Sequence, residues 1–149
     1  ITIVGAEGVH VEYASCCYPI PGDKITGVLK KGSGIQVHDS SCKVLKELSY
    51  SMQPQDVISL SWAKDIKNFF PSKIILEMTN ATGSLAKAVN IISDEKCNIR
   101  NLTVDEVAPS YAIVSLVIDV SCRKYLAGIM RHLRQLRHVM RVIRVKDDS

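Results

Sequence analysis

The sequence predicts an α+β protein made of two modules, a small β-rich one with a single helix and a larger one with a four-stranded sheet. Two observations favour this division. Short β-rich runs fill the first half of the chain, which also holds three of its five cysteines. After a polar connection at residues 63–72, strands of period 2 alternate with amphipathic helices. We place the modules at residues 1–66 and 67–149.

The first module should contain several short strands joined by tight turns. Its expected strands are residues 2–5, 9–14, 25–29, 34–38 and 57–62. Residues 30–33 carry two lysines and a glycine, which predicts a hairpin turn. Ser40 or Ser41 should cap a helix. Its apolar face comprises Val44, Leu45 and Leu48. A module of this size has a small hydrophobic core, so a further cross-link would add to its stability.

The second module shows a more regular pattern. Its expected strands are residues 74–78, 98–107, 112–118 and 139–145. One helix is expected behind Gly83 and another from Cys122, each with apolar residues at helical spacing. The resulting order is βαββαβ. Two helices on one side of a four-stranded antiparallel sheet form a ferredoxin-like arrangement.

Composition bears on the cellular setting. No stretch approaches the roughly 18 to 20 apolar residues of a membrane helix. The first residue, Ile1, offers neither an initiator methionine nor a signal peptide, so we expect a piece of a longer polypeptide with no membrane association. Five cysteines, an odd number, argue against a disulfide framework. A reducing cytoplasm is the expected location.

The net charge of +4 is unevenly distributed. Residues 1–68 hold seven Lys/Arg and seven Asp/Glu, whereas residues 69–149 hold twelve against eight. The excess includes Arg131, Arg134 and Arg137. These basic residues could bind nucleic acid or could simply form the solvent-exposed face of a helix. The solvated face is the simpler interpretation, since no aromatic residues are interleaved with the cluster.

Four residues of the first module form a candidate metal site. Cys16, Cys17, His38 and Cys42 supply three thiolates and an imidazole, the ligand set of a structural zinc ion. His38 should end a strand and Cys42 should begin a helix four residues later, so that both can approach one ion. Buried thiols beside a core histidine are the alternative interpretation. A nucleophilic cysteine is weaker, because no third orienting group accompanies it. We expect no catalytic residues in this chain.

A candidate ligand site lies where the first helix of the second module begins. Gly83 permits close approach, and the N–H groups of a helix start favour a carboxylate. Asn80 could add a side-chain amide, and Asn98 begins the next strand. The site is expected to comprise Asn80, Thr82, Gly83, Ser84, Leu85, Asn98 and Ile99. Asparagine and glycine before a helix are also ordinary capping residues, so both interpretations stay open.

The first module resembles a known family in specific residues. Residues 14–27 (ASCCYPIPGDKITG), residues 34–38 (GIQVH) and Cys42 are similar to a signature of the Rel/SpoT family. In that family the region is called the zinc-finger or RIS domain and precedes a C-terminal ACT domain. The resemblance implies that Cys16, Cys17, His38 and Cys42 bind zinc. In many members an acidic residue stands where this chain has Ser41.

The second module resembles an ACT domain. Asn80, Gly83, Leu85, Asn98 and Ile99 match the pattern Asn-x-x-Gly-x-Leu…Asn-Ile. ACT domains commonly bind amino acids at this turn, often across a dimer interface. The resemblance therefore implies a homodimer formed through this domain and a branched-chain amino acid, valine or isoleucine, as the first candidate ligand.

Together the two resemblances imply a regulatory region rather than an enzyme. It would sense nutritional state through an amino acid, through ribosomal contact or through both, and control the (p)ppGpp synthetase and hydrolase domains of its own polypeptide in the stringent response. A second hypothesis is a zinc module that binds RNA or the ribosome beside an ACT domain used only for dimerisation. A third is the ACT subunit of a biosynthetic enzyme, in which the cysteine-rich module has no evident role.

Overall fold

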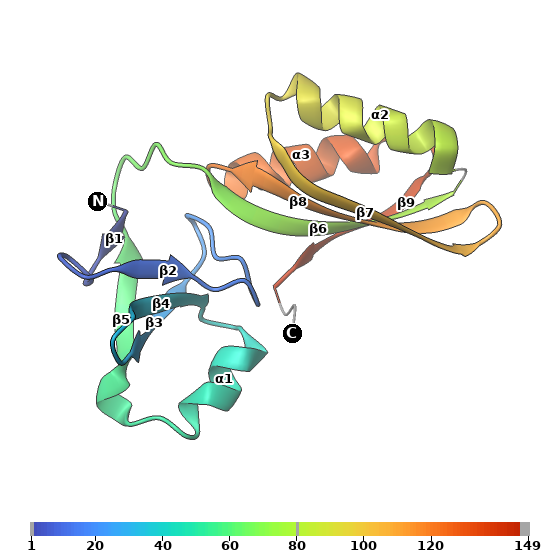
Figure 1. Ribbon diagram of the computed structural model, residues 1–149. Helices are drawn as coiled ribbons and strands as arrows, with labels where there is room; N and C mark the ends of the chain where they lie inside the picture. The colour runs from blue at the N-terminus through green and yellow to red at the C-terminus, as the bar shows by residue number, and fades with distance from the viewer. Residues whose placement is uncertain (1, 80, 147–149) are drawn as a thin grey trace. The chain divides into compact units, whose positions relative to one another are not determined.

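The computed structural model describes residues 2–79 and 81–146, without the side chains of Ala81 and Thr82 (Figure 1). These residues form two compact units. The first comprises the described residues up to Asn68 together with Lys146, and the second is Phe69–Val145. Each unit has its own sheet.

The first unit is built on a twisted, mixed sheet. Its elements are β1 (Ile3–Val4), β2 (Val11–Tyr13), β3 (Ile25–Lys30), β4 (Gly34–Asp39), α1 (Lys43–Ser49), the 3-10 turn η1 (Pro54–Asp56) and β5 (Val57–Trp62). The strand order is β1-β5-β3-β4-β2, and β2 runs parallel to β4. One apolar cluster contains Ile25, Ile35, Val37 and Leu60. A second contains Ala14, Cys17, Val28, Cys42 and Leu45, so two of the predicted metal ligands lie in the core.

The predicted cap of α1 is wrong. The helix begins at Lys43, its N-cap is Cys42, and no side chain caps it. The Ser41 hydroxyl instead donates to Oδ1 of Asp39 at 2.5 Å, and the Ser41 N–H donates to the same oxygen at 2.9 Å. Ser40 pairs with the Thr26 hydroxyl at 2.8 Å. Both serines therefore stabilise the turn between β4 and α1, three and two residues before the helix begins at Lys43.

The second unit confirms the predicted ferredoxin-like order. Its elements are β6 (Phe70–Thr79), α2 (Ala81–Asp94), β7 (Ile99–Ala108), β8 (Tyr111–Val120), α3 (Arg123–Arg134) and β9 (Val139–Val145). The sheet order is β7-β8-β6-β9 with antiparallel neighbours throughout. Both helices cover one face of this sheet (Figure 1). Buried side chains alternate along β6 and β8 and pack toward Leu126, Ile129 and Leu133 of α3.

Two boundaries differ from the sequence-based expectation. β6 begins at Phe70, within the expected polar connection, because Phe70 and Ser72 are buried and pair with Val120 and Ile118 of β8. α2, the first helix of the second unit, begins at Ala81, so the segment around Gly83 that was expected to precede the helix forms its first turn. Among the helices of the described ranges, none has the length and apolar character needed to cross a membrane.

Candidate functional site

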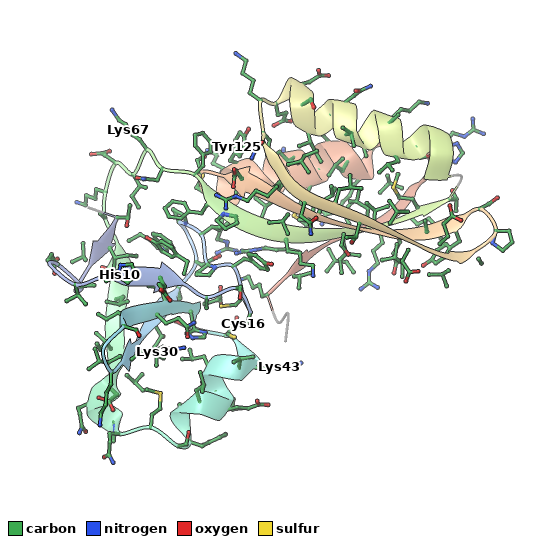
Figure 2. The ribbon with its side chains drawn as sticks, viewed as in Figure 1. His10, Cys16, Lys30, Lys43, Lys67 and Tyr125 are labelled. Carbon is green, nitrogen blue, oxygen red and sulfur yellow. The ribbon has the colours of Figure 1, made fainter. Side chains whose placement is uncertain are left out.

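The four predicted metal ligands meet at one point of the first unit. Cys16 and Cys17 lie in the loop after β2, where Figure 2 labels Cys16, while His38 lies in β4 and Cys42 directly precedes α1. One ligand atom from each residue lies within 4.8 Å of the other three. Cys17, His38 and Cys42 are buried, and Cys16 is half-buried.

The spacing of these atoms fits a tetrahedral zinc site. Zinc bonds of about 2.3 Å to sulfur and about 2.0 Å to nitrogen imply sulfur–sulfur separations of about 3.8 Å and sulfur–nitrogen separations of about 3.5 Å. The Cys16 Sγ lies 3.9 Å from the Cys17 Sγ and 3.6 Å from the Cys42 Sγ. Nδ1 of His38 lies 3.4 Å from the Cys16 Sγ and 3.9 Å from the Cys17 Sγ. These four separations match those of a Cys₃His centre, and the other two, from the Cys42 Sγ to the Cys17 Sγ and to the His38 ring, lie within 4.8 Å.

A rigid turn fixes the loop that carries the two vicinal cysteines. Oδ2 of the buried Asp23 accepts the Ile20 N–H at 2.9 Å, and the Asp23 N–H donates to the Ile20 carbonyl at 3.0 Å. Gly22 adopts φ +102°, a conformation that glycine alone takes without strain. The Trp62 indole N–H donates to the Asp23 carbonyl at 3.1 Å. The Pro-Ile-Pro-Gly-Asp segment therefore holds its own shape and is anchored to β5.

Two further groups orient the ligands and were not predicted from the sequence. Oε1 of Gln36 lies 2.8 Å from Nε2 of His38, so an N–H on Nε2 leaves Nδ1 with a lone pair directed at the sulfurs. The Asp39 N–H donates to the Cys17 Sγ at 3.2 Å. The spacing of Gln36 and His38, two residues apart on one strand, places both side chains on the same face. That spacing was the available signal.

The electrostatics of the cluster favour neutral groups when no cation is bound. Burial, followed by the charge of Lys30, lowers the pKa of His38, which keeps the imidazole in the form that binds metals. Burial also raises the pKa of the Cys16 and Cys17 thiols. Because a thiolate is the ligand form, binding of a cation must be coupled to the release of protons from these thiols.

The residues predicted to bind an amino acid fall into two groups. Asn80 lies outside the described residues, and Thr82 is described by its backbone alone. Gly83 lies in the first turn of α2 and is exposed, and a Cβ added there would meet no atom of the described residues within 4 Å. The Ser84 hydroxyl is buried and donates to the Thr79 carbonyl at 3.2 Å. Leu85 is half-buried in the same turn.

The second group lies at the far end of α2. Nδ2 of Asn98 donates to Oδ2 of Asp119 at 3.0 Å, and Asp119 pairs with Pro71 near the start of β6. Ile99 follows as the first residue of β7. The 11 residues of α2 that follow Gly83 separate it from this end, a length of about 17 Å at the rise of an α-helix. Within one chain the structure does not bring Asn98 and Ile99 to the helix start.

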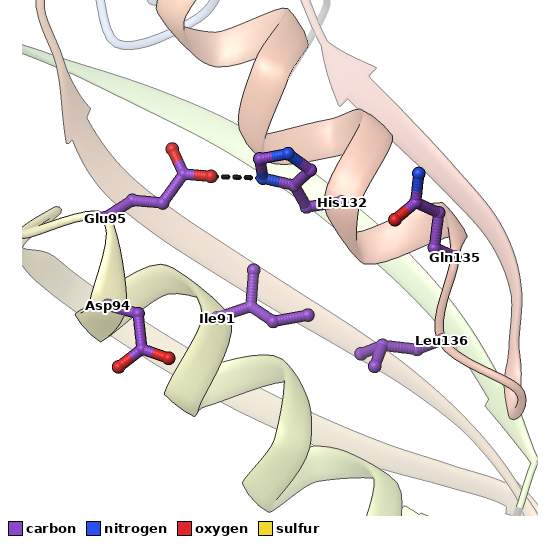
Figure 3. Close-up of a pocket in the computed structure, with 6 residues that line it drawn as sticks. All are labelled: Ile91, Asp94, Glu95, His132, Gln135 and Leu136. Carbon is purple, nitrogen blue, oxygen red and sulfur yellow. Dashed lines mark hydrogen bonds and ion pairs between the residues drawn. The ribbon is translucent and has the colours of Figure 1, made fainter.

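A pocket of about 330 Å³ opens between the two helices of the second unit (Figure 3). Its lining residues are Ile91, Asp94, Glu95, His132, Gln135 and Leu136. Nδ1 of His132 and Oε1 of Glu95 form a hydrogen bond across it, and the Tyr125 hydroxyl donates to the Glu95 carbonyl. No residue of this pocket was predicted to bind a ligand.

Comparison with known proteins gives matches over nearly the whole chain. Residues 1–63 match the family model described as the RelA/SpoT RIS domain, and residues 67–144 match that of the ACT domain. A guanosine-3′,5′-bis(diphosphate) 3′-pyrophosphohydrolase of Vibrio cholerae is 33% identical over 147 residues, 99% of this chain and 21% of the relative. The bifunctional (p)ppGpp synthase/hydrolase SpoT of Escherichia coli is 32% identical over 144 residues, 97% of this chain and 20% of the relative.

A third relative is the bifunctional (p)ppGpp synthase/hydrolase RelA of Mycobacterium tuberculosis. It is 29% identical over 145 residues, 97% of this chain and 19% of the relative. The chain thus spans about a fifth of the length of the curated relatives that it matches.

Proposed function

This chain belongs to the RelA/SpoT family and joins that family's RIS domain to an ACT domain, and on this premise we propose that it senses nutritional state for the catalytic domains of a (p)ppGpp synthase/hydrolase. The observation that carries the proposal is the presence of both domains, in order, in a chain similar to such enzymes over nearly all of its length. A signal can influence distant domains only if it binds two conformations of the whole protein with different affinity.

The proposed role of the Cys₃His cluster is to hold a structural zinc ion. The separations of the four ligand atoms, the burial of three ligands and the hydrogen bond from His38 to Gln36 support this role. The core clusters of the first unit are small, so a metal would contribute directly to its folding. When bound, zinc would act as a cross-link between the β2–β3 loop, β4 and the start of α1.

Metal analysis of the purified chain tests this role. We expect about one zinc per chain, and a Cys42→Ser variant should lose it. A Cys122→Ser variant is the matched control, because Cys122 lies outside the cluster and is half-buried. The zinc role is contradicted by a purified chain without zinc, or by a Cys42→Ser variant that retains it in full.

The proposed ligand of the ACT domain is a branched-chain amino acid bound between two copies of the chain. The first turn of α2 supplies N–H groups for a carboxylate, and the exposed Gly83 leaves room for one. Asn98 and Ile99 lie too far away in the same chain to contribute. A second copy could supply them, since a symmetric dimer repeats each surface on its partner.

Calorimetry and sedimentation test the amino-acid role. Valine or isoleucine should give a binding isotherm and shift the chain toward the dimer, whereas lysine, the control ligand, should do neither. The role is contradicted if valine and isoleucine produce no heat and leave the sedimentation coefficient unchanged.

Contact with the ribosome is the second candidate function. It is favoured by the exposure of Lys30 and Lys31 at the β3–β4 turn and of Arg131 and Arg137 in and after α3, where they could meet phosphates. Replacing Lys30 and Lys31 by glutamate should abolish co-sedimentation with ribosomes and leave valine binding unchanged. Ribosome binding that is insensitive to these changes and to salt would argue against this candidate.

A further inference from the structure

We propose that Cys16 and Cys42 form a disulfide when the Cys₃His cluster meets a hydroperoxide, which makes the cluster an oxidative modification site. The inference concerns the regulation of the same site as the proposed zinc role, and it rests on that role for its consequence, the release of the metal.

Solvent exposure indicates that Cys16 is the thiol with which an oxidant reacts first. Cys17 and Cys42 are 0% and 1% exposed, whereas Cys16 is only half-buried. Cys17 also accepts the Asp39 N–H, which lowers its nucleophilicity further. Reactivity of a sulfur toward peroxide follows its thiolate character and its exposure. Cys16 therefore combines both requirements when the cluster holds a cation.

Geometry singles out Cys42 as its partner. The Cys42 Sγ lies 3.6 Å from the Cys16 Sγ, closer than the Cys17 Sγ at 3.9 Å. Cys16 and Cys17 are also adjacent and joined by a trans peptide bond, so their Cα atoms lie about 3.8 Å apart. Disulfides usually need about 4.4 to 6.8 Å between Cα atoms. A vicinal disulfide is thus disfavoured, and the longer-range pair is the available one.

The reaction balances with hydrogen peroxide as the two-electron oxidant. The Cys16 thiolate attacks one peroxide oxygen, an S–O bond forms, the O–O bond breaks, and hydroxide leaves. The Cys42 thiolate then attacks the Cys16 sulfur, an S–S bond forms, the S–O bond breaks, and a second hydroxide leaves. Two thiolates are oxidised and one peroxide is reduced. Cys17 and His38 remain as two ligands, too few for a closed tetrahedral site.

The experiment treats the zinc-loaded 149-residue chain with hydrogen peroxide and follows two quantities, free zinc by a chelating dye and disulfides by mass spectrometry of tryptic peptides. Trypsin cuts after Lys24, Lys31 and Lys43, so Cys16 and Cys17 share one peptide and Cys42 lies on another. We expect about one zinc released per disulfide formed between these two peptides. Dithiothreitol should reverse the disulfide, and zinc should then rebind.

Variants separate the two cysteines that share a peptide. Cys17→Ser should still form the inter-peptide disulfide, more slowly where its zinc is already lost because the remaining thiols are then protonated, whereas Cys16→Ser should not. Cys122→Ser should behave like the unmodified chain. A disulfide that persists in Cys16→Ser, a Cys16–Cys17 disulfide, or resistance of all three thiols to peroxide overturns the proposal. A chain purified without zinc contradicts the zinc role instead, and its disulfide pattern still tests the pairing.

Discussion

Nε2 of His38 lies 2.8 Å from Oε1 of Gln36, while Nδ1 of the same ring faces the sulfurs of Cys16 and Cys17. An amide oxygen can only accept, so the hydrogen must sit on Nε2, and Nδ1 is left to bind a cation. Gln36 thereby fixes both the tautomer and the orientation of His38, whose ring supplies the one nitrogen among the four candidate ligand atoms.

Removal of the Gln36 acceptor should weaken metal retention. In a Gln36→Leu variant the ring can rotate and change its tautomer, so the affinity for zinc should fall by about 10- to 100-fold. Gln36→Glu keeps an acceptor and should retain most of the affinity. Competition against a chelator of known affinity measures the difference, with the exposed Gln55→Leu as the matched control. Equal zinc affinity in Gln36→Leu and Gln55→Leu would show that the contact has no orienting role.

The metal-free first unit should be most stable between about pH 6.5 and pH 9. The pKa of His38 is lowered on folding, so the unfolded chain binds more protons and stability falls as the pH drops below the ordinary histidine value of 6.5. The pKa values of Cys16 and Cys17 are raised, so stability falls as the pH rises above the ordinary thiol value of 9.0.

Urea unfolding of the metal-free chain at a series of pH values checks this window. Trp62 is the only tryptophan and belongs to the first unit, so its fluorescence reports on that unit. His38→Gln should flatten the acid side of the profile and leave the alkaline side in place. A profile that is flat from pH 5 to pH 10 in the unmodified chain is incompatible with the proposed burial of these groups.

Gly34 should tolerate a side chain far less than Gly32. Both residues have positive φ, +86° and +77°, so alanine at either is strained by roughly 1–2 kcal/mol. A Cβ on Gly34 would also lie 2.2 Å from the His10 carbonyl oxygen, which accepts the Ile35 N–H, whereas a Cβ on Gly32 meets nothing within 4 Å. Unfolding followed by Trp62 fluorescence should show a larger decrease in the free energy of unfolding for Gly34→Ala than for Gly32→Ala. Similar losses for both variants would mean that the approach of β2 to β4 is looser than described.

Complementation between two inactive variants should reveal whether the amino-acid site spans two copies. Gly83→Arg blocks one half of the site and Asn98→Ala removes the other, so neither variant alone should bind valine. An equal mixture that exchanges subunits should recover about a quarter of the sites, since half of the dimers are mixed and each mixed dimer has one intact site. The stoichiometry of valine binding, measured by calorimetry, gives the number of recovered sites. If valine binding does not recover although subunit exchange has been verified, then either one chain holds both halves of the site or the proposed site does not exist.

Much of the fold could be predicted because its periodicities are strong. The alternation of Ala112, Val114, Leu116 and Ile118 marks β8, and the apolar face of α3 is equally plain. The start of β6 was missed because Pro71 and Ser72 are typical of loops, although tertiary pairing with β8 keeps them in the strand. The helix cap was missed because Asp39, which is not adjacent to the helix, captures the Ser41 hydroxyl.

The meeting of Cys16, Cys17, His38 and Cys42 at one point could be predicted from residue type and spacing, since few functions other than metal binding need three thiols and an imidazole in a small module. Gln36 was missed because its one signal is its spacing of two residues from His38, and a glutamine at that spacing on a strand indicates no particular chemistry until its partner is placed. The distance between Gly83 and Asn98 was also missed, because a motif written along the sequence does not show that a whole helix separates its halves.

X-ray absorption spectroscopy at the zinc edge tests the central claim most directly, because it reports the number, type and distance of the ligand atoms. The structure predicts three sulfurs at about 2.3 Å and one nitrogen at about 2.0 Å. A shell dominated by oxygen and nitrogen, or one with fewer than three sulfurs, would contradict a centre formed by Cys16, Cys17, His38 and Cys42.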